Sequence, residues 1–151
     1  MQINHRTHFV FLIPFCNLAH EYKDSNIVIK HPVLKLITKD SNTAAGYLSI
    51  ENNSSKEIVF KGIISDIAKK QELHEVILKN NVYKMRPVQH GIFIKPGNRL
   101  ELKQKSYHLM FFDINKSQLA NEMIEAKLIF DNNMVINVKF KLEIGYVSHS
   151  H

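Results

Sequence analysis

The chain has 151 residues, enough for one domain, and its formal net charge at pH 7 is +6. Hydrophobic residues make up 44% of the chain, so a real core can be buried. The lysines are scattered, and no cluster of Lys and Arg interleaves with aromatic residues. The sequence therefore predicts no nucleic-acid-binding surface.

The first nineteen residues differ from the rest of the chain. Residues 1–8 contain Arg6 and no acidic residue, residues 9–16 are an apolar run, and Ala19 closes the segment. This layout is typical of a secretory signal peptide, and the apolar run is too short to span a membrane. We therefore predict a signal peptide over residues 1–19, with no stable membrane insertion after cleavage. A buried strand of the domain itself is the alternative.

The chain has one cysteine, Cys16, and it lies inside the predicted signal peptide. A lipid anchor on this cysteine is disfavoured, because Phe15 is too bulky for the small residue that normally precedes such an anchor. Cleavage after Ala19 would leave a cysteine-free chain that depends on neither a reducing nor an oxidising compartment. The new terminal residue, His20, could chelate Cu(II) through its amine and imidazole; a frayed polar terminus is the alternative.

From residue 27 onward, short β-rich stretches alternate with turn residues. The clearest pattern is at 136–144, where apolar residues alternate with polar ones, as in a strand with one buried face. Residues 66–70 read as a brief turn or helical loop, and 115–122 is the one stretch with helical character. Eight or nine short strands predict a single all-β domain over 20–146, a cupredoxin-like or immunoglobulin-like Greek-key β-sandwich.

Two histidines and two methionines are candidate metal ligands. The predicted strands 72–78 and 82–88 flank a turn and read as a hairpin, which would bring His74 near Met85. His108 and Met110 lie two residues apart in a predicted strand, so both point to one side, roughly 6.5–7 Å apart. The alternative is that the methionines fill gaps in the core and the histidines serve packing.

The donor atoms of these four side chains favour one kind of ion. Thioethers are soft, neutral donors that suit Cu(I), and imidazole also binds copper. A hard cation would need carboxylates and carbonyls, and a structural zinc site would need thiolates. The absence of a cysteine ligand excludes a blue-copper centre. We therefore predict a Cu(I) site whose neutral ligands leave the charge of the ion uncompensated.

The segments around these positions read His74-Glu75, Lys-Met-Arg-Pro-Val at 84–88 and Tyr-His-Leu-Met at 107–110. They resemble the periplasmic PCu(A)C copper chaperones, whose motif is His, ten residues, Met, about twenty-one residues, His-x-Met. Here ten residues separate the first pair and twenty-two the second. The similarity covers residues 20–144. The family often carries Pro-Trp-Ala-Arg where this chain has Pro-Val-Leu-Lys at 32–35, so any role of that Trp and Arg is absent.

The resemblance implies a function. It implies a monomeric periplasmic copper chaperone that is not an enzyme and binds Cu(I) through His74, Met85, His108 and Met110. It also implies delivery to the copper-centre subunit of cytochrome c oxidase or to another copper assembly factor. Family members often end in His-rich tails, and the tail 147–151 could hold Cu(II) at His149 and His151. A short polar tail with incidental histidines is the alternative.

Three other functions are open on the sequence alone. One is a β-sandwich interaction module without a metal role, and another is a copper storage or resistance protein. The third is an enzyme, for which Glu75 beside His74 is the candidate acid or base. Successive strand residues point to opposite faces, which separates these two side chains. The sequence also contains no recognisable Ser-His-Asp set, Cys-His set or Gly-rich phosphate loop.

Overall fold

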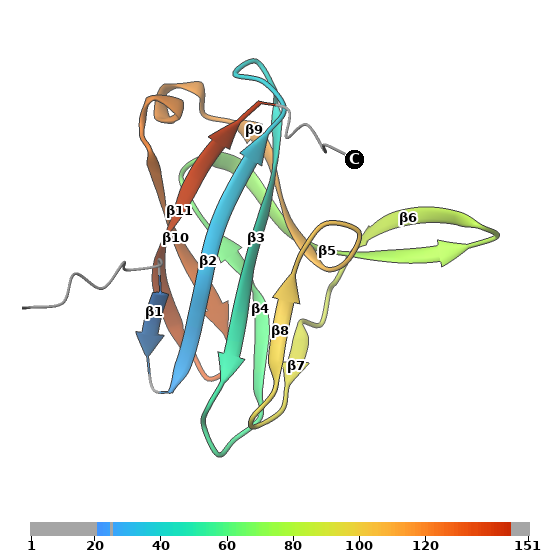
Figure 1. Ribbon diagram of the computed structural model, residues 1–151, viewed down its shortest axis with the longest axis vertical. Coiled ribbons are helices and arrows are strands. Elements are labelled where there is room, and N and C mark those ends of the chain that lie inside the picture. The colour runs from blue at the N-terminus through green and yellow to red at the C-terminus, as the bar shows by residue number, and fades with distance from the viewer. Residues whose placement is uncertain (1–20, 25, 146–151) are drawn as a thin grey trace, which may run out of the picture.

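Eleven strands make up most of the computed structural model, which describes residues 21–24 and 26–145 (Figure 1). The strands are β1 (Glu21–Asp24), β2 (Ile27–Leu36), β3 (Thr43–Asn52), β4 (Ile58–Ile64), β5 (Ala68–Lys79), β6 (Val82–Pro87), β7 (Ile92–Ile94), β8 (Arg99–Leu102), β9 (His108–Ile114), β10 (Met123–Phe130) and β11 (Val135–Ile144). A short 3-10 helix, η1 (Lys116–Ala120), precedes β10. The predicted all-β class is confirmed, and the predicted count of eight or nine strands is too low.

The strands form a sheet that folds over on itself. Its order is β6-β5-β9-β3-β2-β11-β10-β4-β7, with β1 beside β2 and β8 beside β3. β2 and β3 separate β9 from β11 in this order, yet the rings of Phe111 on β9 and Phe140 on β11 lie 6.3 Å apart between centroids. The two strands therefore face each other across a core, which confirms the predicted β-sandwich in one domain.

The core follows the alternation of apolar residues in the strands. On β11, Ile136, Val138 and Phe140 are buried, whereas Asn137 and Lys139 between them are exposed. The inward side chains of the strands belong to one hydrophobic cluster. Alternation of this kind fixes which face of each strand is turned inward, and so fixes which residues remain on the outer face.

One local prediction needs correction, and one strand was not predicted. Residues 66–70 were expected to form a turn or helical loop; Asp66 and Ile67 do form a turn, but β5 already begins at Ala68, which pairs with Ile114 on β9. Pairing with a neighbouring strand overrides the weak β propensity of the Lys-rich segment. The strand β1 lacks an apolar alternation, and it forms by pairing with β2 across a turn at Asn26, where φ is +68°.

The predicted hairpin is present as β5 and β6, and it projects from the body of the sandwich (Figure 1). Its register runs from the His74–Pro87 pair to the Lys79–Val82 pair. The two turn residues, Asn80 and Asn81, have φ values of +51° and +62°. Asparagine tolerates this left-handed conformation, which two-residue hairpin turns require.

Several predictions concern residues outside the described ranges. The signal peptide at 1–19, the Cu(II) candidate His20 and the histidine-containing tail at 147–151 all lie there. Within residues 21–24 and 26–145, no helix is long and apolar enough to cross a membrane.

Two glycines with the same positive φ allow a test of the packing. Gly91 and Gly97 both have φ +77°. A Cβ at Gly91 would lie 2.8 Å from the carbonyl oxygen of Phe60, whereas a Cβ at Gly97 would meet nothing within 4 Å. We expect Gly97→Ala to cost about 1 kcal/mol through its backbone conformation. Gly91→Ala should cost at least about 2 kcal/mol, because overpacking adds to the same strain. Urea unfolding of both variants measures this difference, and equal losses would contradict the packing of β4 against this turn.

Candidate metal centre

The four predicted ligands lie on one face of three neighbouring strands, β6, β5 and β9. His74 is directly opposite His108, and Met110 is directly opposite Glu72. Met85 is directly opposite Val76, which is two residues beyond His74. Opposed residues point to the same side, and so do residues two apart, so all four side chains belong to the same face. The structure therefore brings together residues that are far apart in the sequence.

The two imidazole rings form a nearly buried pair. Their centroids are 5.7 Å apart and their planes are inclined by 67°. His74 is 8% exposed and His108 is 5% exposed. Phe112 covers part of the pair, with its ring centroid 6.1 Å from that of His74. Two imidazoles this close, and shielded from water, can share one small ion.

The protein holds one nitrogen of each ring. Nδ1 of His108 lies 2.8 Å from the carbonyl oxygen of Ser106. A carbonyl only accepts hydrogen bonds, so this nitrogen carries the proton, and Nε2 of the neutral ring has the lone pair. Nε2 of His74 lies 2.6 Å from a carboxylate oxygen of Glu72. By the same reasoning Nε2 is the donor and Nδ1 has the lone pair.

The free nitrogen of His74 has no partner. Its Nδ1 atom is buried and makes no hydrogen bond to any described residue. A buried polar atom without a partner costs about 1–3 kcal/mol, so proteins rarely leave one without a reason. A metal ion bound to this lone pair would satisfy it. The donor set therefore fits a soft metal ion without any change in how the rings are held.

Glu72 is a part of this site that the sequence reasoning missed. Its carboxylate contacts Nε2 of His74 at 2.6 Å and Nζ of Lys70 at 2.7 Å. The hydrogen bond from His74, followed by that from Lys70, holds the pKa of Glu72 below its ordinary value. A negative charge, itself paired with Lys70, thus lies beside the imidazole pair. The expectation of an ion with uncompensated charge considered the four ligands and not this carboxylate, and it stays a prediction. The position of Glu72 two residues before His74 could have predicted a shared face.

The two methionines differ in exposure. Met110 is half-buried, whereas Met85 is 62% exposed on the projecting hairpin. Diagonal neighbours in a ladder are about 7–8 Å apart, and Met85 is diagonal to His74. Met85 is thus the outermost of the four, and the other three lie where β5 joins the body of the sandwich.

Glu75, the candidate acid or base of an enzyme, lies on the opposite face of β5. It is opposite Arg86 in the ladder, and Nε of that arginine lies 2.6 Å from its carboxylate. The prediction that Glu75 and His74 point away from each other is confirmed. Glu75 is therefore engaged in an ion pair on the face away from the imidazoles.

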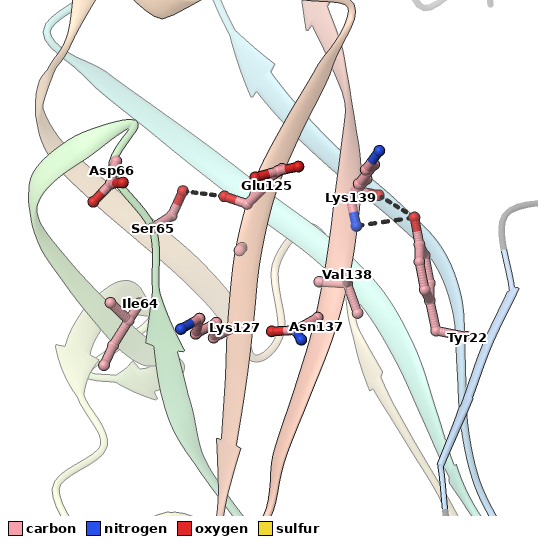
Figure 2. Close-up of a pocket in the computed structure, with 10 residues that line it drawn as sticks. Tyr22, Ile64, Ser65, Asp66, Glu125, Lys127, Asn137, Val138 and Lys139 are labelled. Carbon is pink, nitrogen blue, oxygen red and sulfur yellow. Dashed lines mark hydrogen bonds between the residues drawn. The ribbon is translucent and has the colours of Figure 1, made fainter.

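A separate groove of about 520 Å³ lies over β4, β10 and β11 (Figure 2). The hydroxyl of Tyr22 accepts a hydrogen bond from the Lys139 amide at 2.9 Å and donates one to the Lys139 carbonyl at 3.3 Å. The groove contains none of the four predicted ligands. Nor do the described residues contain any group of three His, Cys, Asp or Glu side chains arranged for a metal. The two histidines would therefore need donors of another kind, such as thioethers, to complete a metal site.

Known proteins resemble this chain in sequence and in fold. The model of the family described as "Putative lipoprotein LpqE-like" matches residues 27–142, most of the chain. Uncharacterized protein RP573 of Rickettsia prowazekii (strain Madrid E) is 28% identical over 110 residues, which are 72% of this chain. They are 60% of that relative, so this chain spans less than two thirds of its length.

Solved structures with the same fold include a PCuAC domain and a second bacterial protein. The copper-bound PCuAC domain from PmoF2 has a TM-score of 0.66 at 20% identity, over 83% of this chain and 98% of that domain. The solution structure of apo-DR1885 from Deinococcus radiodurans has a TM-score of 0.62 at 14% identity, over 97% of both chains. At such identities the likeness shows the fold, and it confirms the resemblance predicted from the sequence.

The hydrogen bonds of the two imidazole rings predict which tautomer each histidine adopts in the metal-free protein. Neutral His74 should be in the Nε2–H form and neutral His108 in the Nδ1–H form. In Glu72→Leu, His74 should become a mixture of its two neutral tautomers, because the carboxylate that accepts the hydrogen bond from its Nε2 is lost. His108 should keep its tautomer, because its Nδ1 contacts the carbonyl of Ser106. Proton–nitrogen correlation NMR of the rings measures both forms. Identical His74 signals in the two proteins would show that Glu72 does not set its tautomer.

Proposed function

We propose that this chain, which belongs to the LpqE-like family and has the PCuAC fold, is a copper carrier. The buried pair of His74 and His108 carries the proposal, because each ring has one nitrogen held by the protein and one lone pair free. A solved relative in fold, the PCuAC domain from PmoF2, is copper-bound. Two imidazoles and two thioethers favour Cu(I) over zinc and over hard cations.

The ligands we propose for Cu(I) are Nδ1 of His74, Nε2 of His108 and the thioether sulfurs of Met85 and Met110. All four ligands are neutral, and Glu72 supplies a negative charge through its contact with His74. A carboxylate that hydrogen-bonds the outer nitrogen of a ligating histidine orients the ring and makes it a stronger donor. Thioethers carry no proton, so these two donors bind without competition from acid.

The site fits a protein that carries copper to an acceptor better than one that stores copper, which is the second candidate function. Met85 is 62% exposed, so an incoming ligand can reach this side of the ion. Thiolates are charged and soft, and an acceptor with two of them binds Cu(I) more strongly than neutral donors do. The acceptor we propose is the copper-centre subunit of cytochrome c oxidase or another copper assembly factor. An interaction module without a metal role would leave the buried Nδ1 of His74 unexplained.

The methionine ligands can be tested by exchange for leucine, which roughly conserves side-chain volume. Met85→Leu and Met110→Leu should each lower fold stability by less than about 1.5 kcal/mol. Each should weaken Cu(I) binding about tenfold or more, because a donor atom is lost, and tenfold corresponds to about 1.4 kcal/mol. Competition with a Cu(I)-specific chelator measures the affinity. We expect the unaltered chain to bind one equivalent of Cu(I).

The control for this exchange is Met123→Leu. Met123 is half-buried like Met110 but lies on β10, away from the candidate centre. Its exchange should leave Cu(I) affinity unchanged. If all three variants bind Cu(I) like the unaltered chain, the methionines are packing residues and the metal lies elsewhere.

We also propose that the protein acts in the periplasm after removal of residues 1–19. The apolar run behind Arg6 supports export, and the matching family is described as a lipoprotein family. Material exported by a bacterial host should begin at His20, which intact mass spectrometry would establish. An exported chain that keeps residues 1–19 would contradict the proposed cleavage. Lipid on Cys16 would show that the protein is anchored to a membrane after export.

A further inference from the structure

The β5–β6 hairpin carries much of the exposed apolar surface of the molecule. Of the eight large hydrophobic residues exposed in the described ranges, four lie on it: Leu78 (60%), Val82 (54%), Tyr83 (68%) and Met85 (62%). The hairpin projects from the sandwich, and β6 pairs with β5 alone (Figure 1). Apolar side chains gathered on a projecting element are typical of a surface that a partner covers.

Three of these apolar residues continue the ligand-bearing face. Tyr83 is directly opposite Leu78, and Met85 is directly opposite Val76. Leu78, Tyr83 and Met85 share one face with His74, because Leu78 and Val76 lie an even number of residues along β5 from it, whereas Val82 is opposite Lys79 and points to the other face. We call Leu78, Tyr83 and Met85 the apolar strip. It begins at the imidazole pair and runs outward along the hairpin, with Met85 as both a strip residue and a proposed ligand.

The hairpin beyond the metal centre is positively charged. Residues 76–87 include Lys79, Lys84 and Arg86 and no carboxylate. Lys84 is opposite Ile77 in the ladder, so its side chain starts from the face behind the apolar strip. Arg86 is paired with Glu75, and the two lysines leave the hairpin with an excess of positive charge. This excess attracts a partner of negative charge before contact is made.

We propose that the apolar strip is the docking surface for the copper acceptor. The acceptor is a protein with an apolar patch beside its thiolate copper site and with acidic residues around that patch. This inference rests on the proposed copper-carrier function. A strip of three side chains is smaller than a stable interface needs, so the encounter is brief, as transfer of a cargo requires.

Two other occupants of the strip fit less well. A second copy of the chain could pair along the free edge of β6, but Lys84 and Arg86 lie on that strand, and charges on an edge strand oppose such pairing. A membrane could take up the apolar side chains, but the tip of the hairpin is Asn80 and Asn81, which are polar. Neither occupant would need the strip to begin at the imidazole pair.

The experiment measures the rate at which Cu(I) leaves the full chain for a soluble cytochrome c oxidase copper-centre domain with its two cysteines reduced. Tyr83→Ser should lower the bimolecular transfer rate about tenfold, the cost of losing one buried aromatic contact. The matched control is Phe93→Ser, because Phe93 is 64% exposed but lies on β7. The control should transfer at the unaltered rate, and both variants should keep the Cu(I) affinity of the unaltered chain.

The charge is tested in the same assay. Lys84→Glu should slow transfer, and added salt should slow transfer from the unaltered chain, because both weaken attraction to an acidic acceptor. Lys95→Glu makes the same change in charge on an exposed residue outside the hairpin, and it should have a smaller effect. Equal effects of the two lysine variants would mean that only overall charge matters, which would overturn the role of the hairpin.

The remaining outcomes separate the docking surface from the proposed function. If the unaltered chain binds no Cu(I), the carrier function fails and the docking inference falls with it. If Cu(I) binds and moves equally fast from Tyr83→Ser and Phe93→Ser, only the docking inference is overturned. Two further measurements test the other occupants in Tyr83→Ser when its transfer rate is unchanged. If this variant no longer binds phosphatidylglycerol vesicles that the unaltered chain binds, the strip contacts a membrane. If it no longer forms a dimer that the unaltered chain forms in sedimentation, the strip contacts a second copy.

Discussion

The register between β5 and β9 is the constraint on which the candidate metal centre depends. It sets His74 directly opposite His108 and Glu72 directly opposite Met110. A slip of one residue would turn one strand's ligands toward the core, because successive strand residues face opposite sides. Leu73, Leu109 and Phe111 oppose such a slip, since all three are buried on the other face of the same two strands. The hydrophobic core thus holds the imidazole pair in place from the opposite face of these strands.

Burial gives this pair its chemical character. A lone pair on a solvent-exposed imidazole is satisfied by water, whereas that on Nδ1 of His74 is buried and has no partner among the described residues. The desolvation cost of about 1–3 kcal/mol is already present in the metal-free protein, so an ion that binds there does not have to displace a hydrogen bond. Glu72 and Ser106 each hold the far nitrogen of one ring, which keeps the free nitrogens available.

The parts of this structure that could be predicted are those that neighbouring residues in the sequence determine. The buried stripe of β11 follows from its alternation, and the hairpin follows from Asn80 and Asn81 between two β-rich runs. The pairing of β5 with β9 could not be derived from the residues alone, because it joins segments more than thirty residues apart. The fold class was predicted from strand spacing, and the ligand positions rest on donor chemistry and on resemblance to a family. Glu72 could not be predicted from the donor chemistry of Cu(I), because that ion prefers soft ligands and the carboxylate acts on it only through His74.

Met85 links the two surfaces that the structure sets next to each other. The imidazoles lie at the base of the hairpin, nearly buried, while Met85 lies on the projecting part and is mostly exposed. In the proposed carrier, an acceptor thiolate that approaches along the apolar strip meets the ion on the Met85 side first. Exchange of this exposed thioether for a thiolate needs no movement of the buried rings, so the first step of transfer does not open the core. The buried ligands then leave an ion that is already held by a stronger donor. In this proposal, retention and release would reside in different parts of one ligand set, because the fold buries the two imidazoles and exposes Met85.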